Sequence, residues 1–532
     1  MGRHAMTRNV KFLLPLLLAG CAGLKGLPDS SAERSPRLRG GLTGNESIFD
    51  GTKDSAAPAR SGTEIAATAV PGSYRDLKAV APAYLPPLLS SRADTLPNRA
   101  VVYWVADSQL PVASVKFYWK EGTLGLPPLQ ATQVQLLGPM LRQGGVKGMS
   151  AQAVDDTLEE LAAEIEIGFG AVRTEAGVEG FSRDLPYLLE LFSRMLREPS
   201  LDTAQLSIAQ ASAVQAIEHR LDAPAQVLEA AWGQVNYGPS AWTRRSDTDQ
   251  IRSVTPQALR TLLQGRLDPS RLVIAVAGRF DRAALRQKLS ELFPAPPRPA
   301  AGLDALPPLP PQHERGAWIA PVEASQAFVK IGTRFVRRDH PDYYPLMLAC
   351  QVLGSGFGTR LVDRIRSDEG LAYHVGAFAG SDYDRQAVLG VELQTKSASA
   401  HRAVQLVFEE IVRLREQGFL PGELDKARKG LKASLPSLFD SPEATAELFG
   451  LSATWGRKDD HFRTYQRALD TIPEAQVLEV FRRHFAPEEL RIVVAGPKDE
   501  LLAAPKDGSR RLDSYGPVHI LSREELLRGD AR

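Results

Sequence analysis

Two side chains in the second half of the sequence are of types that suit transition-state chemistry. Arg366 and Tyr373 stand seven residues apart, behind a short loop rich in glycine. A guanidinium and a phenolic hydroxyl both donate hydrogen bonds, so they could stabilise the negative oxygen of a tetrahedral intermediate in peptide hydrolysis. Arg366 and Tyr373 are therefore candidates for a catalytic role, which their types and spacing alone do not establish. The loop before them is the candidate substrate-binding segment: Gly354, Ser355, Gly356, Phe357 and Gly358.

Other interpretations of these residues stay open. Arg366 could form a surface ion pair with Asp363 or Asp368 while Tyr373 packs beneath a strand. The loop has no P-loop lysine, so a phosphate site is not indicated, and its glycines instead permit a close approach of backbone to backbone or to a bound peptide. His374 has no second ligand at metal spacing, and no Ser-His-Asp or Cys-His set is evident.

An internal repeat indicates how these residues are positioned. PQA at 256–258 precedes LDPSRLVIAVAG at 267–278, and PEA at 473–475 precedes FAPEELRIVVAG at 485–496. Each copy has the pattern of an amphipathic helix, a turn and a buried strand that ends in glycine. A weaker echo at a similar offset pairs Ser114-Val115-Lys116 with Phe328-Val329-Lys330. Chance likeness of helix ends is the alternative, but two echoes at one offset favour duplication.

The sequence therefore predicts an α+β fold of two tandem homologous domains, each a mostly antiparallel sheet covered by helices. Its 532 residues exceed what one core usually supports. We expect an N-terminal domain at 95–293, a Pro-rich linker at 294–315, a C-terminal domain at 316–500 and a tail at 501–532.

Periodicity predicts several elements of the N-terminal domain. Ser150 suits the N-cap of a helix whose Val154, Leu158, Leu161 and Ile165 share one face. Strands are expected at 101–105, 112–119 and 272–277, and further helices at 188–196 and 282–292.

The glycine loop, Arg366, the triplet Gly370-Leu371-Ala372 and Tyr373 together resemble the second-domain signature of the pitrilysin and insulinase metallopeptidases. The likeness extends over roughly residues 95–500. In members built of two chains, one chain carries zinc and the other carries this arginine and tyrosine. The resemblance implies that the chain forms a half-clamshell in which Arg366 and Tyr373 reach substrate beside a partner's zinc.

The same resemblance places the family's zinc-binding HxxEH helix within 125–148. Zinc chemistry needs two imidazoles one helical turn apart and a carboxylate as general base. The five motif positions are Gln135, Leu136, Leu137, Gly138 and Pro139. None of these is a zinc ligand, Pro139 is expected to kink the helix, and the third-ligand region near Ala216 offers only Glu218, an expected solvated residue. We therefore predict no metal and no cofactor in this chain, with zinc in a partner chain.

The N-terminus resembles that of a bacterial lipoprotein. Basic residues precede an apolar run at 12–18 that is too short to span a bilayer and suits a signal peptide at 1–20. The run ends in LAGC, where Cys21 would be lipidated; an ordinary cleaved signal with an incidental cysteine is the alternative. Residues 21–94 are then expected to be a flexible tether. We predict a lipid-anchored protein of the bacterial cell envelope, at the outer membrane facing the periplasm, translated from Met1 or Met6.

Composition excludes some classes of function. The formal net charge is +1 and no basic tract has interleaved aromatics, so nucleic acid is not an expected partner. With Cys21 lipidated, only Cys350 remains, so no intramolecular disulfide is possible. Its apolar neighbours indicate an inert core thiol.

The leading hypothesis is a substrate-binding, non-zinc subunit of a heteromeric zinc metalloendopeptidase. It would be inactive alone and would form a heterodimer with a homologous HxxEH chain, acting on peptides or unfolded proteins. The alternative is a non-proteolytic peptide-binding or scaffolding lipoprotein of the same family, like the members that are structural subunits of respiratory complexes. An independent hydrolase is a distant third.

Overall fold

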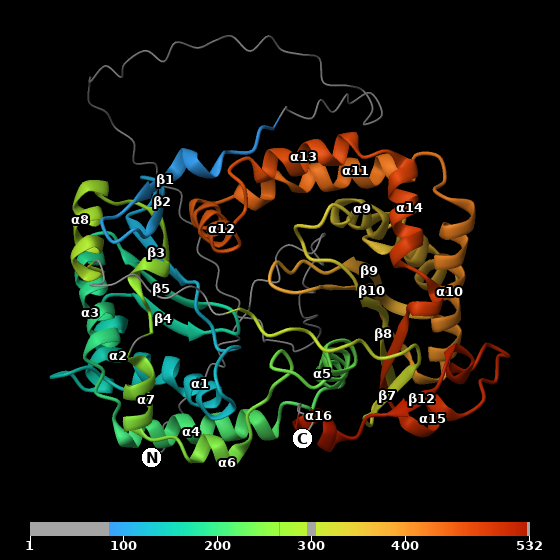
Figure 1. Ribbon diagram of the computed structural model, residues 1–532, viewed down its shortest axis with the longest axis horizontal. Coiled ribbons are helices and arrows are strands. Elements are labelled where there is room, and N and C mark those ends of the chain that lie inside the picture. The colour runs from blue at the N-terminus through green and yellow to red at the C-terminus, as the bar shows by residue number, and fades with distance from the viewer. Residues whose placement is uncertain (1–83, 265, 295–304, 529–532) are drawn as a thin grey trace, which may run out of the picture. The chain divides into compact units, whose positions relative to one another are not determined.

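The computed structural model describes residues 84–264, 266–294 and 305–528 (Figure 1). The expected signal peptide, Cys21, most of the expected tether and the first part of the Pro-rich linker lie outside these residues. From Pro86 onward the described residues belong to one compact unit. Among them, no helix combines the length and the apolar character needed to cross a bilayer.

Two sheets organise the described part of the chain, and each contains six strands. The strands of the first sheet are, in spatial order, β1 (Ala93–Thr95), β2 (Val101–Ala106), β6 (Leu272–Gly278), β3 (Val112–Trp119), β5 (Thr174–Phe181) and β4 (Glu164–Phe169). Those of the second sheet are β12 (Val518–Ile520), β7 (Ala317–Pro321), β11 (Arg491–Gly496), β8 (Gln326–Arg334), β10 (Val388–Lys396) and β9 (Ala372–Ala379).

Five strands of each sheet have the same order and the same directions. The pairs β2–β6 and β7–β11 are parallel, and the three pairs that follow in each sheet are antiparallel. Lys116 lies opposite Ala275 of β6, and Lys330 lies opposite Val493 of β11. Ala275 and Val493 each stand three residues before the glycine that ends their strand. The two lysines are therefore equivalent positions. The expected α+β duplication is confirmed, although the edge strands β1 and β12 differ in direction.

The repeated helix–turn–strand motif has the expected structure in both copies. In the first copy, helix α7 (Pro256–Leu263) leads through a short 3₁₀ turn into β6. In the second copy, α14 (Glu474–His484) leads through a similar turn into β11. Every residue of β6 and β11 is buried, as expected for central strands covered on both faces.

Helices pack on both faces of the two sheets. The remaining helices of the first half are α1 (Pro128–Gln143), α2 (Ala151–Glu160), α3 (Leu185–Arg197), α4 (Thr203–Glu218), α5 (Pro224–Tyr237), α6 (Thr248–Arg252) and α8 (Arg282–Leu292). Those of the second half are α9 (Tyr343–Gly354), α10 (Ala400–Gln417), α11 (Glu423–Ser434), α12 (Pro442–Thr454), α13 (His461–Thr471), α15 (Lys498–Leu502) and α16 (Arg523–Arg528).

The inner faces of the sheets are covered by exchanged helices. Helix α5, from the first half, packs Trp232 and Val235 in one apolar cluster with Trp318 and Val493 of the second sheet. Helix α12, from the second half, lies on β2, β3 and β6 of the first sheet. Its Phe449 ring is 5.7 Å from the ring of Tyr103. Figure 1 shows both exchanges, with green α5 beside β8 and orange α12 beside β2 and β3.

Several sequence expectations need correction at their edges. Folded structure begins before residue 95, because β1 pairs with β2. Residues after 500 are integral, because β12 joins the second sheet and α16 packs on α5. Ser150 does cap α2 through Ala153 N–H, but the helix ends at Glu160 and Ile165 lies in β4. Alternation in EIEIGF overrides the helical spacing there.

Candidate functional site

Arg366 and Tyr373 lie on neighbouring elements of the second half. Helix α9 ends at Gly354, a loop follows, and Arg366 lies in the π-helical segment η4 (Val362–Asp368). Tyr373 is the second residue of β9, which is the edge strand of its sheet. π-Helical turns are rare and occur frequently at functional sites, so the local backbone agrees with a functional position.

The structure brings Arg366 together with Tyr373 and with Phe357 of the glycine loop. The guanidinium carbon lies 5.1 Å from the centre of the Phe357 ring and 5.3 Å from that of Tyr373. Phe357 and Tyr373 are 77% and 84% exposed. Cation–π attraction to both rings therefore holds the guanidinium at the surface. We call these three residues the arginine–aromatic cluster.

The alternative arrangement of these residues is not found. Within the described ranges, Arg366 forms no ion pair with Asp363 or Asp368. Tyr373 points to solvent instead of packing beneath a strand. The guanidinium and the phenol are thus both available to a ligand.

The glycines of the loop have the expected conformational roles. A Cβ on Gly354 would lie 2.6 Å from Ala377 N of β9, so this position requires glycine for close backbone approach. Gly356 and Gly358 have φ values of 105° and 69°, which other residues rarely adopt. Ser355 Oγ donates to Ala377 O at 3.0 Å. The loop is therefore fixed to β9 while Phe357 is presented to solvent.

Arg360 anchors the other end of the loop. Its guanidinium donates to both carboxylate oxygens of Glu423 and to Gly418 O, with only 8% of the side chain exposed. A bidentate pair of this kind fixes geometry as well as supplying energy. Arg360 is therefore a positioning residue for η4.

A chain of charged groups runs from β9 across the sheet. His374 Nε2 lies 3.4 Å from Glu392 Oε1, and Glu392 Oε2 lies 3.7 Å from Lys330 Nζ. The hydrogen bond to Glu392 raises the pKa of His374 above its usual value, although burial and the charge of Arg366 oppose this. The same bond, with Lys330, lowers the pKa of Glu392. His374 was predicted not to bind a metal, and its partner Glu392 could not be found from spacing within one strand because it lies on β10.

Helix α1 contains the five positions of the expected zinc motif, 135–139, and none of their residues is a zinc ligand. Helix α1 continues through Pro139, and both Gln135 and Pro139 are exposed. Gly138 is buried against β4, where a Cβ would lie 2.6 Å from Ile167 O. A glutamate there would require the helix and strand to move apart. Glu218 is exposed at the end of α4, and the described residues contain no group of His, Cys, Asp or Glu that could hold a metal ion.

Comparison with known proteins agrees with this geometry. Residues 253–431 match the family described as "Peptidase M16 inactive domain". The "Uncharacterized zinc protease YmxG" of Bacillus subtilis is 21% identical over 295 residues, which are 55% of this chain and 70% of that protein. The "Non-peptidase homolog YmxG" of Helicobacter pylori is 37% identical over 116 residues, which are 21% of this chain and 26% of that protein.

A solved structure shares the fold. The peptidase M16 inactive domain from Pseudomonas fluorescens aligns with a TM-score of 0.64 at 22% identity, covering 76% of this chain and 98% of that one. The resemblance to the pitrilysin and insulinase family, peptidase family M16, is therefore confirmed. The match over residues 253–431 and the shared fold support a non-catalytic member of that family, and the residues that the structure describes contain no zinc site.

Proposed function

We propose that this chain is the substrate-contacting, zinc-free subunit of a two-chain metalloendopeptidase. Members of the family often act in pairs. In this proposal a homologous HxxEH chain supplies the metal and the general base. The chain described here supplies the arginine–aromatic cluster, and peptides or unfolded proteins are the substrates.

The observation that carries the proposal is the half-buried guanidinium of Arg366, which forms no ion pair with a carboxylate of the described residues. An arginine at the surface can pair with a carboxylate or extend its charged group into water. Here two exposed aromatic rings restrain it instead, at 5.1 Å and 5.3 Å. Restraint before substrate arrives reduces the entropy lost on binding. This suits a donor that must be aimed in advance.

The chemistry available to the cluster is oxyanion stabilisation. The Arg366 guanidinium donates hydrogen bonds in a planar fork, and Tyr373, whose ring centre lies 5.3 Å from the guanidinium carbon, offers its hydroxyl as a further donor. Negative charge that develops on a peptide carbonyl oxygen would be stabilised by both donors. A single donor of this type typically contributes about 3 kcal/mol to transition-state stabilisation. Phe357 would contribute apolar contact to a substrate side chain.

The proposal includes a location. The LAGC sequence that ends in Cys21 supports a lipid anchor in the bacterial cell envelope, and the composition of the residues that follow supports a tether between the anchor and the folded part.

Reconstitution tests the proposal. The purified chain should contain no stoichiometric zinc and should not cleave a quenched fluorescent peptide library. Mixing it with the product of an adjacent HxxEH reading frame should produce zinc-dependent cleavage that neither chain shows alone. If no such chain confers hydrolysis, the second candidate stands. That candidate, a peptide-binding or scaffolding protein, is favoured by the likeness to the Helicobacter pylori protein named a non-peptidase homolog.

A further inference from the structure

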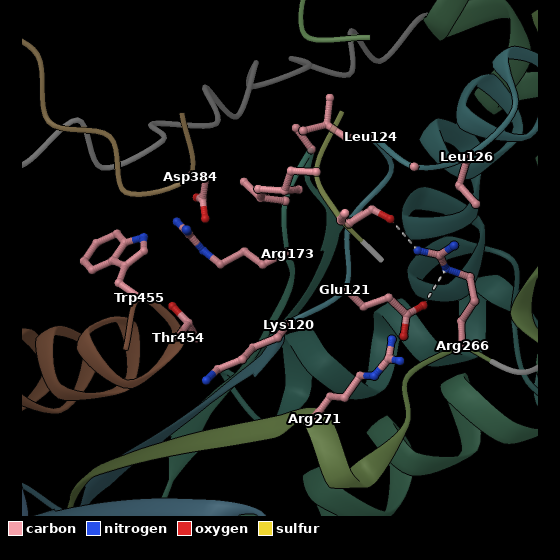
Figure 2. A pocket seen from close by; sticks show the side chains of 16 residues that line it. Lys120, Glu121, Leu124, Leu126, Arg173, Arg266, Arg271, Asp384, Thr454 and Trp455 are labelled. Carbon is pink, nitrogen blue, oxygen red and sulfur yellow. Dashed lines mark hydrogen bonds and ion pairs between the residues drawn. The ribbon is translucent and has the colours of Figure 1, made fainter. Parts of the chain in front are cut away.

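A pocket of about 350 Å³ lies apart from the arginine–aromatic cluster and shares no residue with it. Both halves of the chain contribute to it. The first half supplies Lys120, which follows β3, and Arg173 in the β4–β5 hairpin. The second half supplies Asp384 from the β9–β10 loop and Trp455 at the end of α12. Figure 2 shows these side chains around the cavity.

One side of the pocket is neutralised internally. Arg266 Nε lies 3.1 Å from Glu121 Oε1, and the two side chains are only 9% and 13% exposed. Arg266 also donates to Gly122 O at 2.9 Å. Figure 2 shows Arg271 on the same side, near Glu121. This side of the pocket therefore has a fixed structure and its carboxylate is already paired.

The opposite side of the pocket contains Arg173, Asp384 and Trp455. Arg173 pairs with Glu175 at 2.5 Å and lies 5.3 Å from the centre of the Trp455 ring. Figure 2 shows its guanidinium extending toward Asp384, beside the indole. Burial, together with the neighbouring charge of Asp382, raises the pKa of Asp384. The arginine is thus oriented by three neighbours.

Lys120 lines this pocket and forms no ion pair with a carboxylate among the described residues. Its side chain is partly buried, and burial lowers its pKa. Holding an ammonium group away from water without a counter-charge costs free energy. A bound anion would remove that cost. Figure 2 shows Lys120 extending to the side of the cavity where Thr454 lies.

We propose that this pocket binds a carboxylate carried on a small apolar group, as at the C-terminus of a peptide. One unpaired ammonium suits a monoanion better than a phosphate dianion. Leu124, Leu126, Leu306 and the indole of Trp455 supply the apolar lining. A branched aliphatic side chain would fit against this lining while its carboxylate meets Lys120. The ligand requires neither the Arg366 cluster nor a partner chain, so the inference goes beyond the proposed function.

Calorimetry with the full chain and matched peptides tests the site. The tripeptide Ala-Ala-Leu with a free C-terminus should bind about 10-fold to 100-fold more tightly than its C-terminal amide, because the amide loses the charge-assisted contact. Lys120→Met keeps the stem and removes the charge, so it should abolish the difference between acid and amide. Lys429→Met, on the exposed face of α11, is the matched control and should preserve it.

Three results would overturn the proposal. The first is equal binding of acid and amide by the wild-type chain, a comparison that needs no variant. The second is an unchanged preference in a Lys120→Met protein with wild-type thermal stability. The third is inorganic phosphate displacing the tripeptide at equal or lower concentration, which would indicate a site for another anion. The carboxylate could belong to a peptide C-terminus or to a free amino acid. N-Acetyl-leucine resembles the end of a peptide, so a site for peptide C-termini should bind it more tightly than free leucine.

Discussion

Lys330 of the second sheet forms an ion pair with Glu229 of α5, a helix that belongs to the first half of the chain. The arrangement has a counterpart in the other half. The equivalent Lys116 forms an ion pair with Glu179 at 2.6 Å, and the charge of Glu447 on α12 acts to raise the pKa of Lys116. Glu229 and Glu447 are both the sixth residue of helices that begin with proline. Each half thus places a helix glutamate near the central lysine of the other sheet.

The first prediction concerns the stability of this contact. Lys330 is 11% exposed and Glu229 is 62% exposed, so Glu229→Gln alone should cost about 1 kcal/mol or less. Combining it with Glu392→Gln leaves the buried ammonium with neither carboxylate, and this should cost about 3 kcal/mol. Urea unfolding followed by circular dichroism measures both.

Two further variants define the controls. Lys330→Met in the double variant should recover most of the loss, because no unpaired charge remains. Lys432→Met removes the ion pair between Lys432 and Asp470, whose side chains are 37% and 52% exposed respectively. Because both are exposed, this variant should change stability little. A double variant as stable as wild type would mean that Lys330 reaches water.

The repeat was predictable from sequence, whereas the helix exchange was not. Two copies of a helix, a turn and a buried strand are visible as similar strings at a fixed offset, and the structure equates Lys116 with Lys330 as that echo suggested. The amphipathic pattern of α5 shows that one face is buried, but it does not specify which sheet buries it. Two equivalent sheets make the choice ambiguous, and only tertiary contacts decide it.

The candidate site divides in the same way. That Arg366 and Tyr373 lie together was predictable, because they match the signature that the sequence resembles, whereas their role stays a prediction. That Phe357 would stack on Arg366 depends on the left-handed turns at Gly356 and Gly358, which set the direction of the loop. The pocket at Lys120 combines residues from six separate segments, so no local pattern could indicate it.

The second prediction concerns the former zinc helix. Gly138→Ala should destabilise the protein by about 1–3 kcal/mol, because its Cβ would lie 2.6 Å from Ile167 O. Gly430→Ala is the matched control: this helical glycine has open space around it and should gain about 0.5–1 kcal/mol. Denaturant midpoints compare the two. Equal effects would show that α1 can move away from β4 at little cost.

The third prediction is a pH dependence that arises from His374. Its pKa is raised, so it contributes stability that is present below the unfolded pKa of about 6.5 and lost as pH rises through the folded value. Glu392 has a lowered pKa, so its contribution is present above its unfolded pKa and lost as pH falls through the folded value. The pair should stabilise most between these limits.

Proton NMR titration of the His374 imidazole checks this dependence. Glu392→Gln should lower its pKa, and Arg366→Gln should raise it, since the guanidinium charge opposes protonation. His374→Gln should flatten the stability profile near neutral pH. A pKa insensitive to both substitutions would contradict the arrangement.

The fourth prediction concerns the proposed anchor. Cys21→Ala should release the protein from the membrane fraction and abolish incorporation of labelled palmitate, because the attached acyl chains are the proposed hold on the bilayer. Cys350→Ala removes the other cysteine, which is buried, and should leave membrane association unchanged. Cell fractionation and immunoblotting distinguish the two variants. A Cys21→Ala protein that stays in the membrane after signal cleavage would refute the anchor.

The fifth prediction separates a functional arginine–aromatic cluster from a structural one. Tyr373→Phe removes one hydroxyl from a side chain that is 84% exposed, so folding and partner binding should be unchanged. In the reconstituted complex, kcat should fall by about 10²- to 10³-fold while KM changes little, as expected for a donor used mainly in the transition state. Tyr187→Phe, at an exposed position on α3, is the matched control and should have no effect.

Arg366→Lys extends the same test to the guanidinium. An ammonium keeps the charge but cannot reproduce the planar fork or its stacking between Phe357 and Tyr373, so kcat should fall although net charge is preserved. Phe357→Leu should have a smaller effect, because Tyr373 still restrains the arginine. If Tyr373→Phe and Arg366→Lys both cleave at the wild-type rate in a complex that requires this chain, the cluster is structural. The chain would then act as a scaffold for its partner.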